Sequence, residues 1–243
     1  MTGKLLLVTR PFPGGQKTVA SLAALGHQPV ACPLFSKKIL PFDIPSPHHM
    51  VATIFTSANA VKAVLSEELE ISHQLLPCFT VGDTTAQTAE YSGFHNVINA
   101  KGNAQDLIAM IKKMGLGGPY FYPCAIDRKP DIEDAFRGTE VMVEATPVYE
   151  MVPAPSLSQP VINKLRDGGI DAVLIYSQRA AEHFIKLCTQ FDVELATQNF
   201  VCLSPTIWET LQVAGAKNGF VAEEPNENAL FAQIDVLSNS KSA

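Results

Sequence analysis

The chain has 243 residues, enough for one large domain or two small ones, and 47% of them are hydrophobic against 17% charged. This composition excludes a disordered or fibrous chain and predicts a globular protein. The 18 basic and 24 acidic residues give a net charge of −6 without any basic run, so we expect no nucleic-acid partner. No apolar stretch is long enough to span a membrane, and the apolar run near the N-terminus is too short for the core of a signal peptide. These two observations predict a cytoplasmic protein without a membrane partner.

The cysteines and histidines predict neither disulfides nor a metal site. The five cysteines form an odd set without a C-x-x-C pair, and we interpret them as apolar core residues. The six histidines are scattered without ligand spacing, and the chain lacks the glycine motifs that bind nucleotide phosphates. The sequence therefore indicates no metal and no nucleotide cofactor.

Strand-length apolar runs alternate with helical patterns along the chain. Several runs lack polar alternation, which is typical of strands covered on both faces of a parallel sheet. The expected strands are Leu5 to Val8, Pro29 to Leu34, Val51 to Phe55, Phe79 to Val81, Tyr120 to Tyr122, Val141 to Val143, Ala172 to Ile175 and Phe200 to Leu203. Four expected helices end before a glycine, which supplies the left-handed residue that helix ends favour: Gly26, Gly93, Gly138 and Gly215. The alternation predicts an α/β fold.

An internal repeat indicates two similar domains. Residues 54–61 resemble residues 174–181, each an apolar strand that runs into a serine and then a helix. The unit after the first copy, around Tyr122 to Cys124, has its counterpart at the N-terminus, at Val8 to Pro11. One domain is then continuous and the other is assembled from both chain ends.

The chain must cross twice between such domains. We expect a discontinuous domain of residues 1–35 and 153–243, a continuous domain of residues 40–147, and connectors at residues 36–39 and 148–152. Two adjacent connectors make a hinge, and a cleft between the domains is the expected ligand site.

Hydroxyl residues recur where a strand runs into a helix, at Ser57, Thr84, Ser177 and Thr206. Helix N-termini bind anions through their free N–H groups and their dipole. Each hydroxyl alone can equally cap its own helix, but the recurrence in both halves favours a shared ligand. Tyr149, near an expected crossing, is either a packed linker aromatic or a hydrogen-bond donor in the cleft.

Together these features resemble the uroporphyrinogen-III synthase family. The matching segments are Leu7 to Pro11, Phe55 to Ser57, Val81 to Ala86, Gly102 to Ala104, Tyr122 to Cys124, Val148 to Tyr149, Tyr176 to Ser177 and Leu203 to Thr206. The resemblance implies two flavodoxin-like domains joined by a two-stranded connector, no cofactor and a monomer. It also implies cyclisation of hydroxymethylbilane, a linear tetrapyrrole, to uroporphyrinogen III in haem biosynthesis, with loss of water and inversion of ring D. A transient contact with the preceding pathway enzyme is a further expectation.

The resemblance also assigns site residues. Tyr149 matches the family tyrosine proposed to hydrogen-bond the departing hydroxyl and is the expected catalytic residue. The expected substrate-binding residues are Arg10, Thr56, Ser57, Gly82, Thr84, Thr85, Asn103, Ala104, Pro123, Ser177, Arg179, Ser204 and Thr206. The chain departs from the pattern at Asn59, where some members have Arg, and at Ser204 and Ile207, where Gly and Thr are common.

Two other function classes fit the residues alone. A non-catalytic two-domain protein can close on a small anion with the same hinge, and the isomer formed from hydroxymethylbilane distinguishes it from the synthase. A flavodoxin-like electron carrier would hold a flavin, which its absorbance would reveal.

Overall fold

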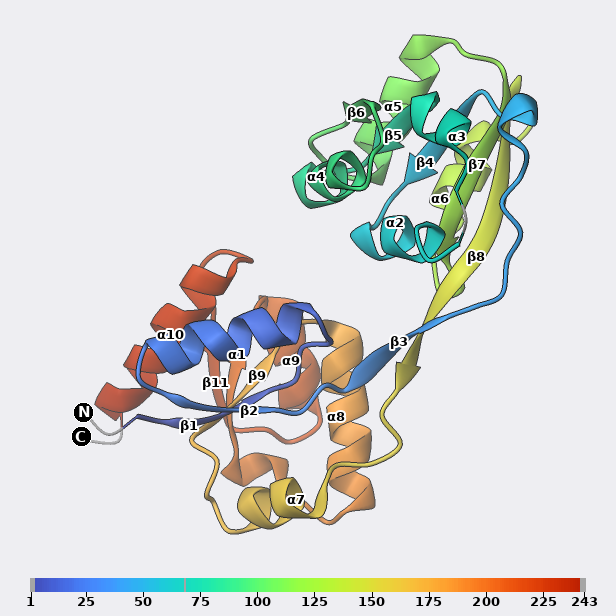
Figure 1. Ribbon diagram of the computed structural model, residues 1–243. Coiled ribbons are helices and arrows are strands. Elements are labelled where there is room, and N and C mark those ends of the chain that lie inside the picture. The colour runs from blue at the N-terminus through green and yellow to red at the C-terminus, as the bar shows by residue number, and fades with distance from the viewer. Residues whose placement is uncertain (1–2, 68, 241–243) are drawn as a thin grey trace. The chain divides into compact units, whose positions relative to one another are not determined.

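The computed structural model describes residues 3–67 and 69–240 (Figure 1). Residues 1–2 and 241–243 of the expected discontinuous domain, and residue 68 of the continuous one, lie outside the described residues. The chain divides into two compact units: unit 1 comprises Met1–Lys37 and Val152–Ala243, and unit 2 comprises Lys38–Met151. Across the described residues, no helix has the length and apolar character needed to cross a membrane.

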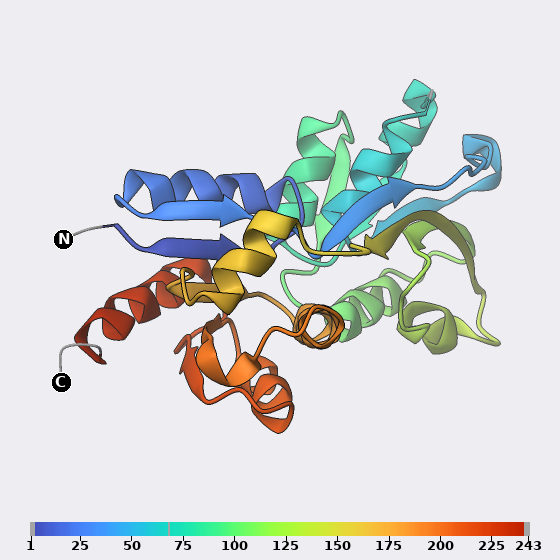
Figure 2. The same ribbon diagram turned by 90° about the horizontal axis from the view of Figure 1, so that it is seen from below.

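Unit 1 contains a five-stranded sheet in the order β11-β10-β9-β1-β2, and every neighbouring pair is parallel. In chain order this is the 2-1-3-4-5 arrangement of flavodoxin-like sheets. Figure 2 shows the N-terminal strands and the C-terminal helix α10 in this same unit. The strands are β1 (Leu5–Val8), β2 (Gln28–Ala31), β9 (Ala172–Ile175), β10 (Asn199–Cys202) and β11 (Asn218–Val221).

Helices cover both faces of the unit 1 sheet, because its strands are apolar on both sides. On one face Leu6, Leu174 and Val201 pack with residues of α1 (Gly14–Ala24) and α10 (Glu227–Ser240). On the other face Phe184 of α8 meets Phe200 of β10 edge-on, with ring centres 6.0 Å apart. The remaining helices of this unit are α7 (Gln159–Arg166), α8 (Gln178–Gln190), α9 (Pro205–Val213) and the 3-10 helix Leu195–Thr197.

The second sheet has the order β3-β8-β7-β4-β5-β6 and belongs to unit 2, except for residues 35–37 of β3 and 152–153 of β8, which are part of unit 1. The strands β4 to β8 pair in parallel, and β7 and β8 occupy the places that β1 and β2 hold in unit 1. This correspondence agrees with the internal repeat, in which the segment around Tyr122 to Cys124 matches Val8 to Pro11. The edge strand β3 runs antiparallel to β8, since Leu40 N–H donates to Val148 and Ala154 N–H donates to Leu34. The strands are β3 (Phe35–Ile39), β4 (Ala52–Phe55), β5 (Pro77–Thr80), β6 (Asn96–Asn99), β7 (Gly118–Ala125) and β8 (Val141–Pro153).

The two faces of the unit 2 sheet also carry separate apolar clusters. Phe55 packs with residues of α2 and α4, whereas its neighbour Ile54 packs with residues of α5 and α6. Successive residues of a strand point to opposite faces, so β4 contributes to both clusters. The helices are α2 (Ala58–Val64), α3 (Ile71–Leu75), α4 (Asp83–Tyr91), α5 (Ala104–Met114), α6 (Asp131–Phe136) and the 3-10 helix Pro47–His49.

The structure confirms the α/β fold class and most of its elements. All eight expected strands overlap observed strands, although the one expected at Pro29 to Leu34 ends at Ala31. The four helix-ending glycines are left-handed, with φ of +84° at Gly26, +91° at Gly93, +77° at Gly138 and +102° at Gly215. All five cysteines are free; four are buried and Cys32 is half-buried, as expected of core residues.

Gly219 of β11 allows the Trp208 ring of α9 to pack closely against the strand. A Cβ at this position would lie 2.2 Å from Cε3 of the Trp208 ring, closer than any real contact. We expect Gly219→Ala to lower the free energy of unfolding by about 1–3 kcal/mol, because the indole must shift. Gly169→Ala is the matched control, since the nearest atom to its Cβ would be 3.5 Å away. Equal thermal midpoints for the two variants would contradict this packing.

Candidate functional site

The strand order reverses between β1 and β9 in unit 1 and between β7 and β4 in unit 2. Ligands of doubly wound sheets bind outside the carboxyl ends of strands at such a reversal. Most of the sequence-predicted residues lie at these carboxyl ends or at the helix starts that follow, whereas Pro123 lies within β7 and Tyr149 within β8. Arg10 follows β1, Ser177 follows β9 and Ser57 follows β4. Neighbouring strand ends carry the rest: Gly82, Thr84 and Thr85 after β5, Asn103 and Ala104 after β6, and Ser204 and Thr206 after β10.

Tyr149 and Ser57 are in direct contact within unit 2. The Tyr149 hydroxyl donates a hydrogen bond of 3.2 Å to Ser57 Oγ, which also accepts the N–H of Asn59 at 3.0 Å and so caps α2. The Tyr149 ring is 7% exposed and belongs to the apolar cluster on that face of the sheet. The packed ring agrees with the interpretation of Tyr149 as a packed linker aromatic, and its role as a donor to a ligand stays a prediction.

Thr56 contacts a second tyrosine on β7. Thr56 Oγ1 lies 3.2 Å from the hydroxyl of Tyr122, whose neighbour Pro123 is buried in the strand. Burial, as the main cause, raises the pKa of Tyr122 to about 12, so this phenol stays protonated and can donate. The Arg128 guanidinium lies 5.8 Å from the centre of the Tyr122 ring and forms an ion pair with Glu133.

The N-termini of α4 and α5 are partly satisfied by their own residues. Asn103 Oδ1 accepts the N–H of Gln105 at 2.8 Å, and the Asp106 carboxylate accepts the N–H of Asn103 at 2.8 Å, a capping box. At α4, the N-cap residue is Gly82, which has no side chain to cap the helix. The Thr85 N–H donates to the Gly82 carbonyl. Thr84 is exposed and Thr85 is buried. Asn103 is thus held by its own helix.

Unit 1 has a pocket of about 370 Å³ at the carboxyl ends of its strands. Arg10 Nη1 lies 2.9 Å from Glu227 Oε1, to which Thr18 also donates, and the Arg10 guanidinium is 5.4 Å from the centre of the Tyr176 ring. Burial raises the pKa of Tyr176, and the nearby Glu227 carboxylate raises it further. The pocket is lined by Arg10, Tyr176, Leu203, Pro225, Asn226 and Glu227.

The helices α8 and α9 differ at their N-termini. Ser177 Oγ accepts the N–H of Ala180 at 3.2 Å and caps α8, where Arg179 lies 4.8 Å from the centre of the Phe35 ring. Ser204 precedes α9 without a side-chain cap, and the next residue is a proline. Thr206 is exposed at this start. The α9 N-terminus, like that of α4, is therefore not capped by a side chain.

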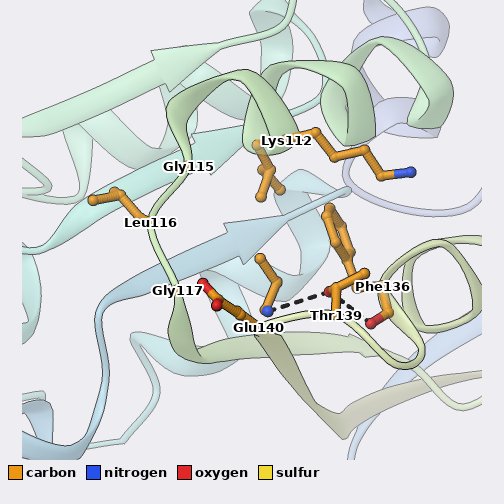
Figure 3. A pocket seen from close by; sticks show the side chains of 9 residues that line it. Lys112, Gly115, Leu116, Gly117, Phe136, Thr139 and Glu140 are labelled. Carbon is orange, nitrogen blue, oxygen red and sulfur yellow. Dashed lines mark hydrogen bonds between the residues drawn. The ribbon is translucent and has the colours of Figure 1, made fainter.

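Another pocket, of about 230 Å³, lies at the opposite end of the unit 2 sheet (Figure 3). It is lined by Lys112 near the end of α5, by Gly117 just before β7 and by Glu140 just before β8. None of the predicted site residues lines it, so the carboxyl ends remain the candidate site. Within residues 3–67 and 69–240, no group of three His, Cys, Asp or Glu side chains could hold a metal.

Sequence reasoning missed several residues of these clusters. Glu227, Thr18 and Tyr176 surround Arg10, and Arg128 and Glu133 surround Tyr122. For Tyr176 the signal was present, because it precedes Ser177 in the repeated strand-to-helix junction. Glu227 is the first residue of α10, but nothing in the sequence pairs it with Arg10.

The fold and the site define a doubly wound α/β protein with hydroxyls, helix N-termini and an arginine at the carboxyl ends of the parallel strands of two sheets. The model of the uroporphyrinogen-III synthase HemD family, HEM4, matches residues 16–232. The chain therefore belongs to the uroporphyrinogen-III synthase family. No curated relative matches it in sequence.

Solved structures of the family share the fold. The crystal structure of uroporphyrinogen-III synthetase from Helicobacter pylori 26695 has a TM-score of 0.67 and 17% identity, over 97% of this chain and 100% of that one. A mutant uroporphyrinogen III synthase from the extremely thermophilic bacterium Thermus thermophilus has a TM-score of 0.57 and 15% identity, over 98% and 100%. The chain is a cyclising lyase of tetrapyrrole biosynthesis that converts hydroxymethylbilane to uroporphyrinogen III.

The capped start of α5 and the uncapped start of α9 predict different losses of stability on mutation. Asn103→Ala removes the capping box of α5, and we expect it to lower the free energy of unfolding by about 1 kcal/mol. Ser204→Ala removes a hydroxyl that makes no cap, so we expect a change within about 0.5 kcal/mol. Chemical denaturation of both variants checks this, and a larger loss for Ser204→Ala would refute the assignment of the caps.

Proposed function

We propose that Tyr149 assists loss of the terminal hydroxyl of hydroxymethylbilane and that residues at the carboxyl ends of both sheets bind the substrate carboxylates. The observation that carries this proposal is the hydrogen bond from the Tyr149 hydroxyl to Ser57, at the start of α2. It links the expected catalytic residue to an expected binding residue.

The chemistry needs a donor and a fixed geometry more than a nucleophile. The electron-rich pyrrole expels the hydroxyl and gives an azafulvene, which then reacts with the other end of the chain. Tyr149 donates its proton toward the departing oxygen after exchanging its hydrogen bond with Ser57 for one to the substrate. The hydroxyl leaves as water, and the proton that is released on cyclisation replaces the one that Tyr149 gave up.

Orientation decides which isomer forms. Uncatalysed closure gives the uninverted product, so the site must hold ring D where its substituted carbon is attacked and a spiro intermediate forms. Holding reacting groups in place can contribute on the order of 7–11 kcal/mol in favourable systems. Thr56 and Ser57 directly follow β4, and Tyr149 lies within β8, so regular strands position all three side chains.

The eight substrate carboxylates require local positive potential on a protein of net charge −6. The α9 start, with Ser204 and Thr206, offers an uncapped N-terminus, and Arg10 offers a charge in its pocket. Each helix dipole adds about 0.3–1 kcal/mol for an anion at its N-terminus. Gly82, Thr84, Thr85, Ala104, Pro123, Ser177 and Arg179 are proposed as further contacts at the strand ends.

We also propose that units 1 and 2 correspond to the two domains of the family and that the enzyme works as a cytoplasmic monomer. A transient contact with the enzyme that supplies hydroxymethylbilane would shorten the time that this unstable substrate spends free in solution. The resemblance to the family supports each of these proposals. Sedimentation of the purified protein tests the oligomeric state.

Product analysis tests the site in the intact enzyme. We expect incubation with hydroxymethylbilane to give isomer III in excess over isomer I, measured by chromatography after oxidation to porphyrins. Only isomer I, at the uncatalysed rate, would contradict directed cyclisation and favour a non-catalytic binding protein.

Tyr149→Phe tests the proton donor. We expect turnover to fall about 10- to 100-fold, the range for a positioned acid, with an unchanged fold by circular dichroism. Tyr91→Phe is the matched control, because the Tyr91 side chain is 92% exposed. Equal turnover in the two variants would remove Tyr149 from the mechanism.

A further inference from the structure

Arg10 and Glu227 form an ion pair that solvent can reach. Their side chains are 39% and 34% exposed, and both line the pocket of about 370 Å³. Partly exposed pairs are weak because water screens them and because two long side chains must be held in one geometry. An anion that enters the pocket therefore meets a pair that can be separated.

The contact is also incomplete for an arginine and a carboxylate. Only Nη1 of Arg10 and Oε1 of Glu227 take part in the described ion pair, and Thr18 donates to the same Oε1. A guanidinium prefers two parallel hydrogen bonds to both oxygens of a carboxylate. A free carboxylate in the pocket can adopt that bidentate arrangement, which gives it an advantage over Glu227.

The other arginine–glutamate pair provides a contrast inside unit 2. Arg128 uses Nε and Nη2 on Glu133 and Nη1 on the Ala125 carbonyl, and its side chain is 23% exposed. All three guanidinium nitrogens are occupied there. Both arginines lie near a tyrosine ring, but only Arg10 combines a single hydrogen bond with a described pocket.

We propose that Glu227 competes with the substrate for Arg10. In the enzyme without substrate the Glu227 carboxylate is paired with the Arg10 guanidinium. One substrate carboxylate displaces Glu227 and binds Arg10 in the pocket. This inference rests on the proposed function, in which Arg10 contacts the substrate. Glu227 is then a residue that sets affinity, and it weakens the binding of substrate and product alike.

The competition has a defined size. When only a fraction of the receptor is free, the apparent dissociation constant is the intrinsic constant divided by that fraction. For a partly exposed pair, removing the competitor should tighten binding about two- to fivefold. The effect belongs to KM and to product release, not to the chemical step.

The experiment measures KM and kcat for isomer III formation in Glu227→Gln, Arg10→Gln and the double variant. We expect KM to fall about two- to fivefold in Glu227→Gln, to rise in Arg10→Gln, and to be the same in the double variant as in Arg10→Gln. Asp134→Asn is the charge-matched control, because it removes one carboxylate from the exposed pair with Arg137 on α6. Its KM should equal that of the parent enzyme.

A binding measurement gives an independent readout. Uroporphyrin III, the stable oxidised product with the same eight carboxylates, is titrated by fluorescence, and Glu227→Gln should bind it more tightly by the same factor. If Glu227→Gln does not fold, Glu227→Asp shortens the side chain and should shift both constants in the same direction.

The outcomes separate the two proposals. A higher KM in Arg10→Gln with an unchanged or higher KM in folded Glu227→Gln would overturn the competition and leave Arg10 as a substrate contact. An unchanged KM in Arg10→Gln would remove Arg10 from the proposed site and the competition with it.

Discussion

The parallel pairing of β1 with β9 is the interaction on which unit 1 depends. Leu6 aligns with Ala172 and Val8 with Leu174, so β1 joins β2, from the same N-terminal segment, to the three strands that come from beyond residue 171. Leu6 and Leu7 are completely buried. The same pairing brings Arg10 next to Tyr176, because both follow the ends of these strands. In unit 2 the pairing of β4 with β7 does the same for Thr56 and Tyr122.

Much of this architecture can be predicted from the sequence, because buried parallel strands are short apolar runs and helix ends carry glycines. The edge strands β6 and β11 were missed, since Asn96–Asn99 and Asn218–Val221 are partly polar and partly exposed. The site was predicted as a set of residue types at strand ends. Its contacts were not, because the Arg10–Glu227 pair joins residues 217 positions apart and follows only from the packing of α10.

The candidate residues divide by what they already do for the fold. Ser57 and Ser177 cap their own helices, as one interpretation of the hydroxyl residues predicts, and Asn103 caps α5. The same interpretation is wrong for Thr84 and Thr206, because the N-cap residues of α4 and α9 are Gly82 and Ser204. Tyr149 adds a buried ring to the core while its hydroxyl reaches Ser57. A site of this kind costs little stability, since most of its groups also support the scaffold. It suits a reaction in which the substrate supplies the reactivity and the protein supplies the geometry.

The insertion of unit 2 between the two segments of unit 1 has a consequence for synthesis on the ribosome. β1 leaves the ribosome long before β9, and at 5–20 residues per second the intervening stretch takes on the order of 10–30 s to make. During that interval the apolar run Leu5–Val8 has no β9 partner, whereas unit 2 is a single continuous segment that is complete at Met151. Nascent chains are therefore exposed to aggregation through their first strand, and chaperone binding near the N-terminus would protect them until the last third of the chain emerges.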